Sequence, residues 1–205
     1  MSKLNKRNIK KPFSSYDDKG LIRAIQSGDR DAFDELVLRH KDRLFNLIYR
    51  FLGDYQEAND CAQETLIKVF KSIKNFRFES TFSTWLFRIA VNTCKNRLKS
   101  SAYRWGKKTV SLETPDGSSH DNPVVEIVNG SPSPVVQLEK KEKMMRIQEA
   151  LSSLPEEQNR VVVLRDIEGL SYQEIADITG LNPGTVKSRL ARGRLALRSE
   201  LKGKI

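Results

Sequence analysis

Residues 171–192 carry the pattern that most narrows what this chain can fold into. A capping box at Ser171 and Glu174 starts one helix. Gly180 then permits the left-handed backbone of a tight turn, directly before a second helix opens. The opening pair is Asn182 and Pro183, and the residues that let the two helices pack closely are Ala176, Val186 and Leu190. This spacing indicates a helix-turn-helix, a motif that binds duplex DNA.

The second helix of this motif carries most of its cations. From residue 187 onward the chain has seven Lys or Arg and a single acid, Glu200. A helix in the major groove reads base edges with exposed side chains and holds phosphates with cations. The alternative is a helical hairpin whose basic face is only solvated. We expect base contacts from Lys187, Ser188, Ala191 and Arg192, and phosphate contacts from Arg189, Arg194 and Arg198.

Apolar residues recur at helical spacing in both halves of the chain, and no segment alternates with a period of two. The sequence therefore predicts an all-α protein of two small helical domains joined by a flexible linker. We place a disordered basic tail at 1–16, the first domain at 17–101, the linker at 102–134 and the second domain at 135–205. The linker is rich in Gly, Ser, Pro, Asp and Asn. Its length corresponds to about 30 Å when relaxed and about 110 Å when extended.

The third helix of the first domain is expected over about 56–73. Its apolar side includes Cys61, Val69 and Phe70, so the sequence predicts that these three are buried. Cys94, on the fourth helix, also falls on an apolar stripe. The two cysteines are interpreted as small buried hydrophobic residues in a reducing cytosol, not as a disulfide framework.

Residues 76–99 combine aromatic and basic side chains. Five aromatic residues fall within the first twelve positions, and residues 80–112 hold seven Lys or Arg and no acid. Aromatic faces beside cations suit unstacked bases and their phosphates. The alternative is a helix whose aromatic residues form core. Helical spacing places two of them in the core and leaves three outside it: Phe82 and Trp85 inside, and Phe76, Phe78 and Phe87 outside.

Composition limits the remaining function classes. The net charge of +10 favours a polyanionic partner, whether DNA, RNA or an anionic membrane. The chain has no apolar run of about 18 residues, so no membrane span is expected, and Met1–Lys11 lacks the apolar segment of a secretory signal. Two distant histidines leave little for a metal site. We expect no cofactor and no metal, and a cytoplasmic protein.

In combination, the two halves resemble the extracytoplasmic-function sigma factors, the small two-domain promoter-specificity subunits of bacterial RNA polymerase. The similarity covers about 21–100 and 139–201. Asn59–Phe70 resembles the polymerase-docking helix of that family, and Phe76–Asn96 resembles the element that opens and reads the −10 region. Leu154–Arg189 resembles its −35-binding domain.

The resemblance implies a docking role for the solvent side of the third helix. The residues Asp60, Gln63, Glu64 and Lys68 would contact the coiled coil of the largest polymerase subunit. Without the resemblance, this face would be interpreted as a solvated helix surface. The second domain would sit on the flap of the second-largest subunit.

The resemblance also implies roles in the −10 element. Asn92 and Asn96 would read bases, because amide side chains can satisfy the freed pairing edge of a flipped base. Phe76 would form one wall of the base pocket, and Trp85 would support the helix. The phosphates would be held by Arg77, Arg88, Lys95 and Arg97.

From these features we expect a sigma subunit that binds polymerase core, recognises −35 and −10 elements and promotes strand opening, without catalytic residues. A separate anti-sigma protein is a further expected partner. One rival interpretation is an autonomous helix-turn-helix regulator, which leaves the features of residues 76–96 without a role. A second rival is an enzyme acting on single strands, but the sequence shows no cluster of His, Cys and carboxylates.

Overall fold

The computed structural model describes residues 13–100 and 134–203, and every regular element in these ranges is a helix. The all-α prediction is therefore confirmed for the described residues. The first part contains α1 (Asp18–Gln26), α2 (Asp31–Leu52), α3 (Tyr55–Ser72) and α4 (Phe82–Lys99), with short 3-10 turns η1 (Phe13–Ser15) and η2 (Ile73–Asn75). The second contains α6 (Pro134–Ser153), α7 (Glu156–Val162), the π-helical turn η3 (Val163–Ile167), α8 (Tyr172–Thr179) and α9 (Pro183–Leu201).

Local signals explain where the helices of the first part begin and end. Asp17, Asp54 and Thr81 each accept a hydrogen bond from a backbone N–H in the first turn of the helix that follows. These side chains satisfy donors that a helix start leaves unpaired. At the end of α2, Gly53 takes a left-handed φ of 73°, which lets the chain reverse into α3.

The second part is a helix-turn-helix with the predicted capping. Ser171 and Glu174 form both hydrogen bonds of the capping box at the start of α8. Gly180 ends α8 with a φ of 72°, and Asn182 caps α9 by accepting from the N–H of Thr185 at 2.7 Å. The helix-turn-helix expected from the sequence is therefore present in the structure.

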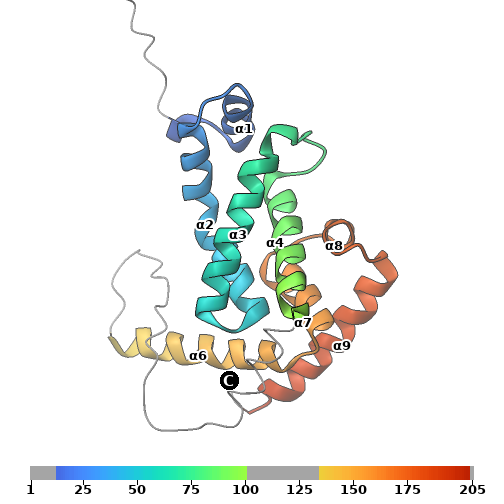
Figure 1. Ribbon diagram of the computed structural model, residues 1–205. Coiled ribbons are helices and arrows are strands. Elements are labelled where there is room, and N and C mark those ends of the chain that lie inside the picture. The colour runs from blue at the N-terminus through green and yellow to red at the C-terminus, as the bar shows by residue number, and fades with distance from the viewer. Residues whose placement is uncertain (1–12, 101–133, 204–205) are drawn as a thin grey trace, which may run out of the picture.

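The two parts pack against each other, with α8 beside α4 and α6 crossing the end of α2 (Figure 1). Their buried apolar residues form one continuous core. The seam also holds polar contacts. Arg43 donates to the Glu168 carboxylate at 2.6 Å, and Thr84 donates to Glu174 at 3.3 Å. The amide of Asn159 donates to the carbonyl of Arg50 at 3.2 Å.

This packing corrects three predictions about burial. Phe76 and Phe87, which helical spacing left outside the core, are 6% and 1% exposed. Phe87 is covered because the guanidinium of Arg43, held by Glu168, lies 5.1 Å from the centre of its ring. Phe70, expected on the buried side of α3, is 48% exposed. Val69 and Ile73 at the same end of the stripe are buried, and Phe70 contacts Phe33 of α2 with 4.9 Å between ring centres, so the prediction was wrong because Phe70 lies at the edge of the α2–α3 contact.

The expected tail at 1–16 and linker at 102–134 lie almost entirely outside the described residues. The domain boundaries at 17, 101 and 135 therefore stay predictions. The structure adds that the parts on either side of the linker are in contact.

A close helix crossing at Gly193 generates the first testable prediction. A Cβ on Gly193 of α9 would lie 2.7 Å from Cγ2 of Val162 in α7, which is too close without movement. A Cβ on Gly184 of the same helix would meet Asn182 Oδ1 at an ordinary 3.4 Å. We expect Gly193→Ala to lower the free energy of unfolding by about 1–3 kcal/mol, and Gly184→Ala not to lower it. Urea unfolding of both variants tests this, and equal stabilities would contradict the close crossing.

Candidate nucleic-acid interface

Helix α9 presents its predicted base-reading residues to solvent. Val186, Leu190 and Gly193 form the buried side that packs on the rest of the second part. The opposite side exposes Lys187, Ser188, Ala191 and Arg192. This is the division that a helix needs in order to enter the major groove while its back stays packed.

The remaining cations of α9 differ in how they are held. Arg189 pairs with Glu157, and Arg194 forms two hydrogen bonds with Asp166. The hydrogen bonds that Arg194 donates to Asp166 raise the pKa of Arg194. Within the described ranges, Arg192 and Arg198 form no hydrogen bond or ion pair. The guanidinium of Arg192, one of the expected base readers, is therefore free to bind a partner.

Tyr172 at the start of α8 shapes the near end of this surface. The ammonium of Lys187 lies 5.7 Å from the centre of its ring, and the guanidinium of Arg165 lies 5.0 Å from it. Both distances are within the range of a cation–π attraction. The Tyr172 ring therefore holds the two cations near the start of α8.

The second candidate surface lies on α4 and the loop before it. Phe76 contacts the rings of Phe78 and Trp85, with centroid distances of 5.0 and 5.2 Å. The side-chain amide of Gln26 donates to the carbonyl of Phe76 at 2.9 Å, which fixes the loop to α1. Phe76 is buried and Trp85 is half-buried, so only the edge of this cluster is accessible.

Phe78 is not among the site residues predicted from the sequence. It has a φ of 59°, a left-handed conformation that costs a bulky residue free energy. Its half-buried ring lies 5.8 Å from the guanidinium of Arg23. Strained backbone of this kind concentrates at functional sites. Its position off the helical stripe was the signal in the sequence.

Asn92 and Asn96 are both exposed, one turn apart on α4. At about 100° per residue, they lie within about 60° of Trp85 and Ile89 around the helix. This face of α4 is distinct from the one that carries Thr84 and meets α8. The predicted reading residues therefore stay accessible while the two parts are packed together.

The residues predicted to contact phosphates around α4 differ in their exposure and in their partners. Arg77 is exposed, whereas Arg88 and Lys95 are half-buried. Arg97 donates to the carboxylates of Glu57 and Asp60 on α3, and its hydrogen bond to Glu57 is the main reason that the pKa of Arg97 is raised. Arg97 is therefore held to α3 in this conformation.

The docking face predicted on α3 is also exposed, and it is less polar than expected. Asp60, Gln63 and Glu64 point to solvent, and Lys68 pairs with Glu64 at 2.7 Å. Lys68 also donates to Thr93 of α4 at 3.1 Å. The sequence-based site prediction missed two exposed apolar residues on α3, Ile67 (55% exposed) and Phe70 (48%), and a third on α2, Leu38 (59%).

The capping box links the two candidate surfaces. Ser171 donates to the Glu174 carboxylate through its backbone N–H at 2.8 Å and its hydroxyl at 2.7 Å, and Thr84 of α4 donates to the other oxygen. The hydrogen bond from the Ser171 backbone is the main cause of the lowered pKa of Glu174, because it favours the charged form. The start of α8 is thus tied to α4 by a charged acceptor.

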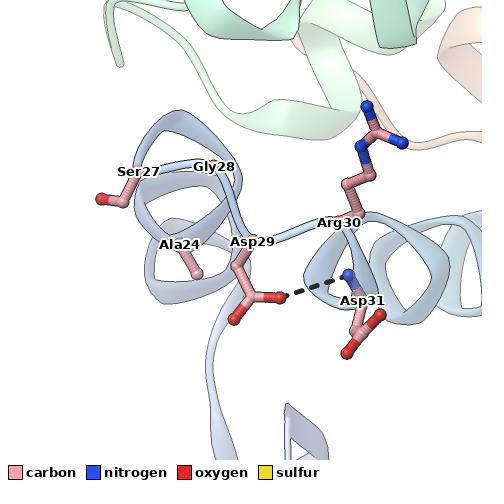
Figure 2. A pocket seen from close by; sticks show the side chains of 6 residues that line it. All are labelled: Ala24, Ser27, Gly28, Asp29, Arg30 and Asp31. Atoms are coloured by element: carbon pink, nitrogen blue, oxygen red, sulfur yellow. Dashed lines mark hydrogen bonds between the residues drawn. The ribbon is translucent and has the colours of Figure 1, made fainter.

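The described residues contain no group of three or more His, Cys, Asp or Glu arranged to hold a metal ion. A shallow open hollow between α1 and α2 is lined by Ala24 and residues 27–31, where Asp29 accepts from the N–H of Asp31 at 3.2 Å (Figure 2). It contains none of the predicted site residues. None of the described helices is long and apolar enough to cross a membrane.

Comparison with known families identifies the two parts of the chain. The family model for sigma-70 region 2 matches residues 36–104, and the one for sigma-70 region 4 matches residues 144–197. The RNA polymerase sigma-H factor of Pseudomonas aeruginosa is 38% identical over 180 residues, which span 88% of this chain and 91% of that protein. The chain belongs to the sigma factor family. The extracytoplasmic-function sigma factor SigW of Bacillus subtilis is 36% identical over 88% of this chain and 95% of its own length.

Solved structures support the fold of this sigma factor. The sigma factor RpoE of Bartonella quintana, in complex with the anti-sigma factor NepR, is 24% identical with a TM-score of 0.63, over 84% of this chain and 98% of that one. CnrH, in complex with the cytosolic domain of CnrY, is 24% identical with a TM-score of 0.62, over 90% and 97%. At this identity the likeness concerns the arrangement of helices.

The family membership decides the function class. Sigma factors bring RNA polymerase to promoters, and this chain is a promoter-specificity subunit of that kind. Its relatives are transcription initiation factors and not enzymes. The docking and −10 residues fall in the region 2 match, and the recognition residues from Lys187 to Arg194 fall in the region 4 match.

The different settings of Arg192 and Arg194 generate the second prediction. Replacing the unpaired Arg192 with Ala should weaken binding to the preferred −35 duplex by about 1–3 kcal/mol, with little change on scrambled duplexes. Replacing Arg194, which is bound to Asp166, should cause a smaller loss that is the same for all sequences. Fluorescence anisotropy on both duplexes measures this. A uniform loss for Arg192→Ala would make that residue a phosphate contact.

Proposed function

We propose that the two exposed surfaces divide promoter recognition between paired and unpaired DNA. Helix α9 enters the major groove of the −35 element, where Lys187, Ser188, Ala191 and Arg192 meet base edges. Arg189, Arg194 and Arg198 flank it and hold phosphates. The observation that supports this most is the clean division of α9 into a packed apolar side and an exposed basic side.

In the same proposal, α4 holds the melted −10 strand. Asn92 and Asn96 supply amide donors and acceptors on one exposed face, as a flipped base needs. The aromatic cluster supports this face, with Phe76 inside it and Trp85 at its edge. Arg77, Arg88 and Lys95 hold phosphates of this strand. Arg97 can join them only after it releases Glu57 and Asp60, so we assign it a role in the bound state alone.

We also propose that α3 docks on polymerase core through a mixed surface. Asp60, Gln63, Glu64 and Lys68 supply its polar part, and the exposed Ile67 and Phe70 supply an apolar part. Exposed apolar side chains beside charged ones are typical of protein interfaces. Docking would cover them, which accounts for large apolar residues left on the surface of the free chain.

The packed arrangement of the two parts cannot itself span a promoter. The −35 and −10 elements lie about 25 base pairs apart, which is about 85 Å of B-form DNA. A compact chain of this length is only about 43 Å across. We propose that region 4 separates from region 2 on the promoter, and that the linker allows it because it can extend to about 110 Å.

An anti-sigma protein is the regulator we propose for this chain. The similar sigma factor RpoE was solved in complex with the anti-sigma factor NepR. We also propose that this chain acts in the cytoplasm, where RNA polymerase works. In-vitro transcription with the chain and core polymerase tests the whole proposal: no initiation, together with binding of a palindromic duplex by the chain alone, would favour an autonomous regulator instead.

The exposed amide on α4 generates the third prediction. Asn92→Ala should reduce open-complex formation at least tenfold, because a flipped base loses its hydrogen-bond partner, while −35 duplex binding stays unchanged. Permanganate reactivity of the melted strand and anisotropy on the duplex measure the two steps. Gln56→Ala removes an exposed amide from the start of α3 and should change neither step. Equal losses in both steps for Asn92→Ala would argue against this assignment.

Separation of the two parts generates the fourth prediction. Arg43 and Glu168 can each be replaced with cysteine in a chain whose Cys61 and Cys94 are alanine. A short bismaleimide then joins the two new cysteines across the seam. The joined chain should still bind an isolated −35 duplex, because α9 stays exposed, but it should not initiate transcription. The same variant treated with N-ethylmaleimide keeps separable parts and should initiate. Equal initiation by both forms would show that separation is not required.

A further inference from the structure

The two cysteines of the chain, which no proposed contact uses, lie next to each other. Cys61 of α3 and Cys94 of α4 are 33 positions apart, yet their sulfur atoms are 3.5 Å apart. Both are free thiols in the core of region 2, with 0% and 1% exposure. The chain contains no other cysteine, so any oxidation at this site involves these two sulfurs alone.

The surroundings make the two sulfurs unequal. The hydrogen bond with the Cys94 thiol is the main reason that the pKa of Cys61 is lowered. Burial and the charge of Glu64 oppose this shift, and the positive charges of Arg97 and Lys68 support it. The same hydrogen bond, together with burial, raises the pKa of Cys94 well above its ordinary value. Because the thiolate is the nucleophile, Cys61 is the sulfur that reacts first.

We propose that Cys61 and Cys94 are an oxidation site that forms a reversible intramolecular disulfide with hydrogen peroxide. The burial of the two sulfurs limits which oxidant can react with them. A molecule of about the size of water, such as hydrogen peroxide, can reach the α3–α4 seam during small openings, and a bulky disulfide cannot. Disulfides of cytosolic proteins are commonly transient and redox-sensing, which fits a pair that cellular reductants return to thiols.

The chemistry balances with peroxide as the only oxidant. The Cys61 thiolate attacks one peroxide oxygen and the O–O bond breaks, which leaves a sulfenic acid on Cys61 and a hydroxide that takes up the Cys61 proton as water. The Cys94 sulfur then attacks the Cys61 sulfur, the S–O bond breaks, and the departing hydroxide takes up the Cys94 proton as a second water. Two electrons pass from the sulfurs to the peroxide oxygens.

Formation of the disulfide requires only a small movement of the two sulfurs, but it affects two helices that carry proposed binding residues. The sulfurs must approach by roughly 1.5 Å to reach the length of a disulfide. Cys61 lies beside Asp60 on the docking helix, and Cys94 lies between Asn92 and Asn96 on the −10 helix. Oxidation would therefore shift and join the two helices. We expect it to weaken docking on core polymerase at least fivefold, a consequence that rests on the proposed docking role of α3.

Mass spectrometry of the full chain tests the site directly. After hydrogen peroxide treatment, unfolding and alkylation, the monomer should have lost two hydrogens and taken up no alkyl group, and dithiothreitol should restore two alkylatable thiols. Oxidised glutathione should react far more slowly with the folded chain. Two free thiols after peroxide, a sulfinic acid as the main product, or a disulfide-linked dimer would each overturn the proposal.

Matched variants identify the order of reaction. Cys94→Ala should stop at a sulfenic acid on Cys61 that dimedone traps, whereas Cys61→Ala should leave Cys94 unreacted. The wild-type mass result stands whether or not these variants fold. Binding to core polymerase is then compared for oxidised and reduced chains. A disulfide without loss of affinity would overturn the regulatory consequence, while weak binding by the reduced chain would count against the docking role.

Discussion

The contact between α8 and α4 is the interaction on which the arrangement of the described molecule depends. Helix α4 belongs to region 2 and α8 to region 4, and the bond from Thr84 to the capping carboxylate of Glu174 joins them. Around it the two apolar cores become continuous. The seam nevertheless includes the partly exposed Arg43, paired with the nearly buried Glu168. Polar contacts of this kind suit an interface that opens, because each group can return to water at modest cost.

Helix α4 has three sides with different surroundings. One side meets α3, where Cys94 approaches Cys61, and another carries Thr84 toward α8. The third side exposes Asn92 and Asn96. A single helix thus supports the docking helix, holds region 4 and presents the candidate reading residues. In the proposed mode of recognition, the packed arrangement would therefore limit promoter binding by geometry alone, without covering the candidate −10 surface.

Most helices were predictable because their signals are local. Capping residues such as Thr81 and Ser171 mark helix starts within a few positions, and Gly180 marks a turn that only a left-handed backbone completes. The misplaced residues depend on distant partners. Phe87 is buried by Arg43 and Glu168, and no periodicity within α4 contains that information. Phe70 sits at the edge of an apolar stripe that is otherwise buried, so its exposure depends on how far the neighbouring helices reach.

In the candidate site, too, local features were predictable from the sequence and contacts with distant partners were not. Exposure of Asn92 and Lys187 could be inferred from helix faces, because each helix buries one side. The pairing of Arg97 with Asp60 could not, since the two residues lie on different helices and were assigned to different partners. Whether a cation is free to meet a phosphate is decided by which carboxylate the fold places beside it. The sequence alone lists the cations but does not give these neighbours.

The apolar residues Leu38, Ile67 and Phe70 have one more consequence. Each leaves about half of its side chain in water, a state that favours contact with any other apolar surface. If core polymerase covers Ile67 and Phe70 as proposed, a chain produced in excess over polymerase would leave these residues uncovered and would self-associate. The amount of chain that stays monomeric in a cell would then be set by the supply of the larger assembly that covers it, so stoichiometry itself would limit how much of this sigma factor is available.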